Sequence, residues 1–287
     1  MTVRHWQRRA GLTLIELVVV LVILAVLAAL VIPRVAGLTG QANAATDATH
    51  INEVNRAALL QEAKSGGEKG PDGADGLLTG PATGAFFSPF HSGIQIGTSA
   101  TSGGSDPMLP SLYPLTLVAN QLASLNAAGI SFVHYNVPNS GDKRPSDSGT
   151  SYRALAVGDQ VAGLMIPQAS FSATTTTPAW TTHGSTFPDR AFNLNPFNAG
   201  DHASSAFVVF GVGQPCQLRG DTMLDAPIVQ SANPEVNYAR VLIVYRVPKA
   251  GGSSDRAQYV GSFNPDGTCL NDNITDAEKA NKGLSTK

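Results

Sequence analysis

An unbroken apolar run at residues 12–32 constrains this chain more than any other feature. Of its 21 residues, 16 are Leu, Ile or Val and three are Ala, so only Thr13 and Glu16 are polar. As a helix that rises about 1.5 Å per residue, the run is roughly 31 Å long, which matches the hydrocarbon core of a bilayer. The sequence therefore predicts a transmembrane helix over residues 12–32.

Glu16 is the residue in this run that opposes insertion. A carboxylate at the centre of a bilayer costs about 2.5–3.5 kcal/mol, whereas each Leu, Ile or Val contributes about −0.3 to −0.6 kcal/mol, so the sum still favours insertion. Because Glu16 lies about 6 Å from the start of the run, its carboxylate reaches the headgroup region in a lone subunit. This position needs an explanation beyond simple anchoring.

The residues at the start of the run resemble a processing signal. Arg8-Arg9-Ala10-Gly11 followed by Leu12-Thr13-Leu14-Ile15-Glu16 is similar to the prepilin motif of type IV pilins and type II secretion pseudopilins. In that family a membrane peptidase cuts after the glycine and methylates the new N-terminus, and the fifth mature residue is glutamate. The resemblance implies cleavage between Gly11 and Leu12, and it places Glu16 and Pro33 where the family has glutamate and commonly proline. It departs at Leu12, where the family usually has phenylalanine.

The resemblance also implies a fold and a function. It predicts an α+β protein in which a long N-terminal helix, half transmembrane and half amphipathic, packs on a C-terminal antiparallel sheet. Such a protein is a structural subunit of a filament, either a type IV pilus or a secretion pseudopilus, and is not an enzyme. Its partners are other pilin-like subunits, the prepilin peptidase, the inner-membrane assembly platform and the lipid bilayer.

A physical role for Glu16 follows from this processing. A carboxylate inside an apolar assembly needs a cation, and the N-terminal amine of Leu12 on a neighbouring subunit lies near the same depth. Such a pair would fix the axial register between subunits. The alternative is that Glu16 is a tolerated polar residue at the edge of the bilayer.

The distribution of basic residues predicts the orientation in the inner membrane. Arg4, Arg8 and Arg9 precede the apolar run, and the first basic residue after it is Arg34. This asymmetry keeps the N-terminus in the cytoplasm and sends the rest of the chain outward, to the periplasm or to a filament at the cell surface. A secretory signal peptide cut near Ala29 has the same polarity. The alternative function is therefore an exported enzyme or binding domain, held by an uncleaved anchor or released there.

The net charge excludes one class of partner. Loss of residues 1–11 removes three arginines and leaves 16 basic against 21 acidic residues, a formal net charge of about −5. A surface with this balance does not favour binding to nucleic acid.

The rest of the chain divides by composition. After the leader at residues 1–11 and the span at 12–32, residues 33–65 continue the helix with one apolar face, formed by Ala44, Ala48, Ile51, Val54 and Ala58. Pro33, Gly37 and Gly40 predict a bend or a locally unwound segment at the junction, and Lys64 before Ser65-Gly66-Gly67 predicts the end of the helix. Residues 66–110 form a Gly-, Ser- and Pro-rich loop region, and residues 111–287 form a β-rich extracytoplasmic domain. Its expected elements are a short helix over 115–125 and strands at 130–137, 152–157, 161–166, 206–212, 239–247 and 257–263, the last two as a hairpin.

Glycine recurs at every third position over residues 67–78, in a pattern that matches four collagen triplets. Four triplets are too few to hold a triple helix, so the segment is predicted to be an exposed loop. Asp72 and Asp75 offer oxygen ligands for calcium, as do Asp266, Asn271, Asp272 and Asn273 near the C-terminus. Neither set has the spacing of an EF-hand, so the prediction is no cofactor, with calcium left as an alternative.

Cys216 and Cys269 are the two cysteines of the chain. Outside the cytoplasm such a pair is expected to oxidise, so the sequence predicts a disulfide that ties the C-terminal segment to the sheet. By loop-closure entropy it would stabilise the fold by roughly 4 kcal/mol. The alternative is two buried thiols.

No catalytic pattern stands out. The six histidines are scattered without a His-Glu-x-x-His motif, and each is read as a surface or structural residue. Gly211-Val212-Gly213 lacks the further glycine of a dinucleotide-binding loop. The sequence therefore predicts neither a metal site nor a catalytic site.

Overall fold

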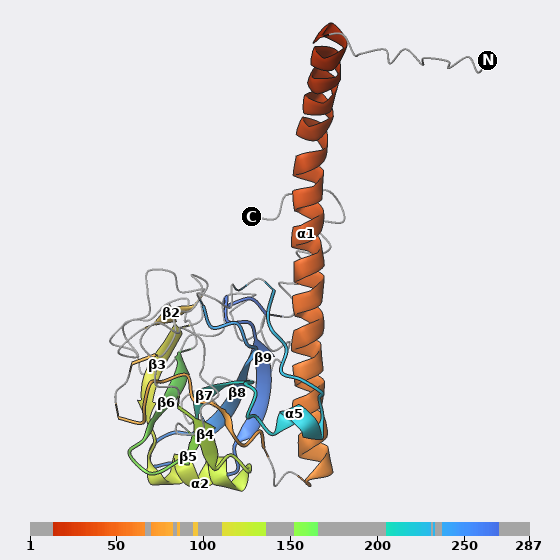
Figure 1. Cartoon of the computed structure of the whole chain (residues 1–287). Helices are drawn as coiled ribbons and strands as arrows, with labels where there is room; N and C mark the ends of the chain where they lie inside the picture. Colours follow the sequence, from red (N-terminus) through yellow and green to blue (C-terminus); the bar gives the residue numbers. More distant parts are fainter. Residues whose placement is uncertain are drawn as a thin grey trace, which may run out of the picture.

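A computed structural model describes residues 14–66, 70–82, 85–86, 94–96, 111–135, 152–165, 205–230, 232 and 237–269 of the chain. Within these ranges a long helix, α1 (Leu14–Lys64), stands beside a nine-stranded sheet. Figure 1 shows that the sheet and its loops lie along the C-terminal half of α1, while the N-terminal half projects away from them. The fold is α+β, as predicted.

The helix α1 is continuous through the position where a bend was predicted. It runs as one α-helix from Leu14 to Lys64 and so includes Pro33, Gly37 and Gly40. The prediction of an unwound junction was wrong, because a proline removes one backbone hydrogen bond and the bonds on either side still hold the helix. The end of α1 was predicted correctly, since Lys64 is its last residue and Gly66 has φ of +61°.

The sheet is organised around β7 (Ser205–Gly211). This strand pairs with β8 (Leu242–Pro248) along its whole length on one side, and with β6 (Gln160–Met165) and then β1 (Ala74–Asp75) on the other. The remaining strands are β2 (Gln95–Ile96), β3 (Ser111–Thr116), β4 (Phe132–His134), β5 (Tyr152–Ala154) and β9 (Gln258–Phe263). They extend the sheet in the order β2-β3-β6-β7-β1-β4-β5, with β9 beside β8.

The sheet is mixed rather than antiparallel. The pairs β1·β4 and β2·β3 are parallel, whereas the other pairs, including the predicted β8·β9 hairpin, are antiparallel. Both parallel pairs use two-residue strands from residues 66–110, which were predicted to form a loop region. Strands this short carry no alternation that a sequence pattern could detect.

The longer strands agree with the sequence, and the short helix does so in part. The strands predicted around β4, β5, β6, β7, β8 and β9 are present, with boundaries that differ by a few residues. The helix predicted over 115–125 is α2 (Ala119–Ala127), and it ends before Gly129, whose φ is +77°. Leu115 belongs to β3 instead, because its apolar spacing fits both a strand and a helix.

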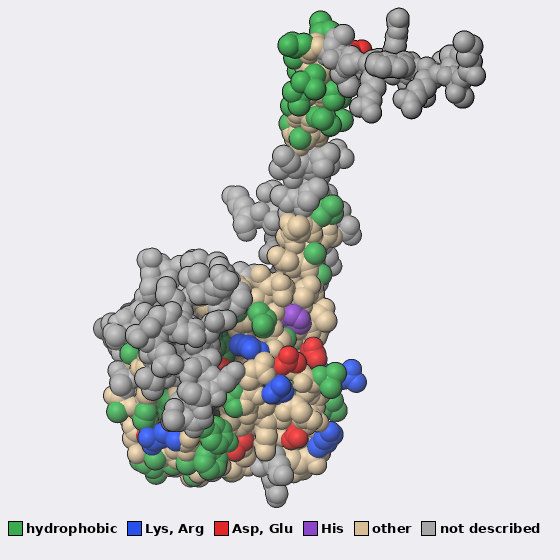
Figure 2. Space-filling model, viewed as in Figure 1, with side chains coloured by type: hydrophobic (Ala, Val, Ile, Leu, Met, Phe, Trp, Pro, Cys, Tyr) green, Lys and Arg blue, Asp and Glu red, His purple; other side chains and the backbone are tan. Residues whose placement is uncertain are grey.

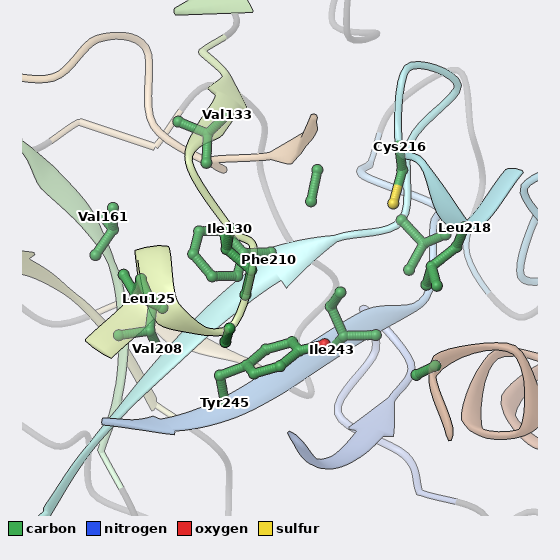
Figure 3. Packing of buried hydrophobic residues seen from close by; sticks show 14 of the residues in the cluster. Leu125, Ile130, Val133, Val161, Val208, Phe210, Cys216, Leu218, Ile243 and Tyr245 are labelled. Carbon is green, nitrogen blue, oxygen red and sulfur yellow. The ribbon is translucent and has the colours of Figure 1, made fainter. Parts of the chain in front are cut away.

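The two faces of the sheet bury separate hydrophobic clusters. Alternate residues of β7 and β8 point to opposite sides, so that Val208 and Ile243 join one cluster and Val209 and Val244 the other. Figure 3 shows the first cluster, in which Phe210, Ile243 and Tyr245 meet residues of α2 and β4. Because α1 adds Val54, Ala57 and Ala58 to this cluster, the amphipathic half of the helix is part of the core.

The glycine-rich segment is buried, which contradicts the prediction of an exposed loop. Residues 73–78 are all buried, and Leu77 and Leu78 have no exposed surface. The glycines allow the backbone to pass close to neighbouring residues, and they do not mark a solvent-exposed loop. A Cβ on Gly73 would lie 2.7 Å from the carbonyl oxygen of Pro215, and the φ of Gly73 is +72°.

The predicted disulfide is not formed in this structure. Cys216 and Cys269 are buried thiols, and they belong to the clusters on opposite faces of the sheet. In Figure 3 the sulfur of Cys216 lies near Leu218 within the first cluster.

The Cys216 thiol is expected to resist alkylation in the folded protein. Burial raises its pKa to about 12, so the nucleophilic thiolate is scarce at pH 8. Iodoacetamide at pH 8 should leave Cys216 unmodified in the native chain, as followed by peptide mass. After unfolding without reductant, two thiols should titrate. Absence of thiols in the unfolded chain would instead indicate an oxidised pair.

Candidate assembly site

The N-terminal half of α1 is bare apolar surface. Its large side chains from Leu14 to Leu27 are 47–81% exposed, and Figure 2 shows hydrophobic atoms over the visible face of this end of the helix. Glu16 lies in the first turn of α1, where a carboxylate is favoured by the helix dipole. Complete burial of a leucine or valine side chain contributes about 1.5–3 kcal/mol. Because these side chains are about half exposed or more, covering this surface with lipid or protein is strongly favourable.

The predicted processing residues lie outside the part of the chain that the structure describes. Gly11 and Leu12 precede the first described residue of α1, and the side chain of Pro33 is also outside it. Within the described residues, no helix has the length and hydropathy needed to cross a membrane. The leader, the cleavage site and the membrane span therefore stay predictions from the sequence.

The C-terminal half of α1 is fixed to the sheet by apolar and polar contacts. Ile51, Val54 and Ala58 are buried, as their spacing predicted. The amide oxygen of Asn55 accepts hydrogen bonds from the hydroxyls of Tyr259 and Ser262 in β9, the latter at 2.9 Å. This polar anchor was missed, because the sequence carries no signal that pairs positions about 200 residues apart.

Two charged residues of α1, Glu62 and Asp47, contact loop residues from later in the chain. The carboxylate of Glu62 lies 2.9 Å from the guanidinium of Arg256, just before β9. Asp47 is not part of the predicted apolar face, but it has no exposed surface, and its Oδ1 accepts a hydrogen bond from the backbone N–H of Gln230 at 2.7 Å. We call the part of the chain that follows α1 the head. The helix and the head are thus connected as one unit along residues 47–64.

A buried polar cluster lies inside the head. The carboxylate of Asp75 in β1 accepts a hydrogen bond from the hydroxyl of Tyr238 at 2.8 Å, and its other oxygen lies 3.3 Å from Nδ1 of His134 in β4. All three side chains are at most 3% exposed. Burial raises the pKa of Tyr238 well above its usual value, as do the charge of Asp75 and the hydrogen bond to it.

Two glycines make room for this cluster. A Cβ on Gly213 would lie 2.3 Å from Oδ2 of Asp75, and one on Gly211 would lie 1.7 Å from the hydroxyl of Tyr238. The Gly211-Val212-Gly213 sequence therefore has a steric role at the end of β7. All three side chains of the cluster are buried, as suits a role in packing.

The carboxylates considered for calcium have other uses where the structure describes them. Asp72 accepts hydrogen bonds from the backbone N–H groups of Ser131 and Phe132, and Asp75 belongs to the buried cluster. Asp266 accepts from the backbone and hydroxyl of Thr268. Asn271, Asp272 and Asn273 lie outside the described residues, and within those residues no group of three or more metal-ligating side chains was found.

Comparison with known proteins identifies the N-terminal segment. Residues 6–32 match the family described as "Prokaryotic N-terminal methylation motif". The match covers residues 6–11 of the predicted leader, the predicted cleavage position and the apolar run that continues into α1. No curated protein and no solved structure matches the chain.

Proposed function

We propose, from the type IV pilin and pseudopilin signature at residues 6–32, that this chain is a structural subunit of a pilus-like or secretion-pseudopilus filament. The signature is that of a membrane-anchored pilin-type precursor. In the proposal the prepilin peptidase cuts between Gly11 and Leu12, the new N-terminus is methylated, and mature subunits assemble through α1. Other pilin-like subunits and the inner-membrane assembly platform are its partners.

The apolar N-terminal half of α1, which projects away from the head, is the observation that supports this proposal most directly. The side chains of this half of α1 are apolar on all sides and are not buried by the rest of the chain. Such a helix suits lateral packing against other subunits after it leaves the membrane. Glu16 would then be buried among apolar helices, where the amine of a neighbouring Leu12 neutralises it.

The size of the head bears on the kind of subunit. About 220 residues follow α1, which is large for a subunit repeated along a thin filament. We therefore propose a minor subunit or an unusual surface pilin rather than an ordinary major pilin. A subunit of this kind is compatible with either a pilus or a secretion pseudopilus.

The N-terminus of the protein recovered from native membranes tests this function. Intact mass and N-terminal sequencing should find a chain that begins at an N-methylated Leu12. Deletion of the prepilin peptidase should return the full-length precursor, which serves as the control. A chain that begins at Met1 in the presence of the peptidase, or just beyond Ala29, contradicts the proposal and favours an exported domain on a simple anchor or signal peptide.

A further inference from the structure

We draw no further inference here: the strongest candidate, the surface patch formed by the stacked and partly exposed rings of Phe132 in β4 and Tyr152 in β5, carries nothing because no contact within the described part of the chain shows what covers it.

Discussion

Replacing Asp75 by alanine is expected to destabilise the head by about 3–5 kcal/mol, because two buried groups lose this acceptor and each such loss costs about 1–3 kcal/mol. The carboxylate is 1% exposed, and the hydroxyl of Tyr238 and the imidazole of His134 both lose it as their acceptor. Because total stabilities are about 5–15 kcal/mol, this is a large share. The melting temperature of the detergent-solubilised chain should fall by roughly 6–20 °C.

A double-mutant cycle with Gly213 distinguishes a specific packing role from general damage. Gly213→Ala alone should destabilise the head, because its new methyl group would lie 2.3 Å from Oδ2 of Asp75. In the D75A/G213A double variant this clash is gone, so the double variant should lose less stability than the two single losses combined. Asp255→Ala, at an exposed carboxylate bonded to Ser253, is the control and should stay within about 0.5 kcal/mol of wild type. Additive losses for D75A and G213A, or a D75A chain that melts like wild type, would contradict the described cluster.

Local patterns explain which parts of this fold could be predicted from the sequence. The apolar run, the stripe containing Ile51 and Val54, and the cation and glycine after it specify α1 and its end within neighbouring residues. The strands β7, β8 and β9 are long enough to show apolar alternation or a continuous apolar run. The methylation motif at residues 6–32 is also local, since its residues are contiguous in the chain.

The buried cluster and the glycine-rich segment could not be predicted in the same way. Asp75 contacts His134 across 59 positions and Tyr238 across 163, and no periodicity links such distant residues. Glycine at every third position indicates either a solvent-exposed turn or a backbone that passes close to other elements, and composition alone does not separate the two. At Gly73 the second reason holds, because the carbonyl of Pro215 occupies the place of a side chain. The contacts that Asp47 and Asn55 make with the head could not be predicted for the same reason.

Replacing Glu16 by alanine is expected to abolish filament assembly without affecting cleavage or the head. In the proposed filament the carboxylate neutralises the amine of a neighbouring Leu12, and its loss would leave that amine unpaired among apolar helices. Breaking such a pair costs about 3–5 kcal/mol, which lowers the subunit association constant by roughly 100- to 4,000-fold. The melting temperature should not change, because Glu16 lies in the first turn of α1, more than 30 residues before the first helix residue anchored to the head.

The measurement is the fraction of mature subunit that sediments as sheared filament, compared among three variants. Glu16→Ala and Glu16→Gln should both fail to assemble, since the amide of glutamine has the size of the carboxylate but not its charge. Val20→Ala, which trims the exposed apolar surface of the same helix, should assemble with a modest loss. Each variant should be cut between Gly11 and Leu12, as judged by intact mass, so that a processing defect is not mistaken for an assembly defect. Assembly of E16Q at the wild-type level would show that charge pairing is not what aligns the subunits, and Glu16 would then be a tolerated polar residue at the edge of the bilayer.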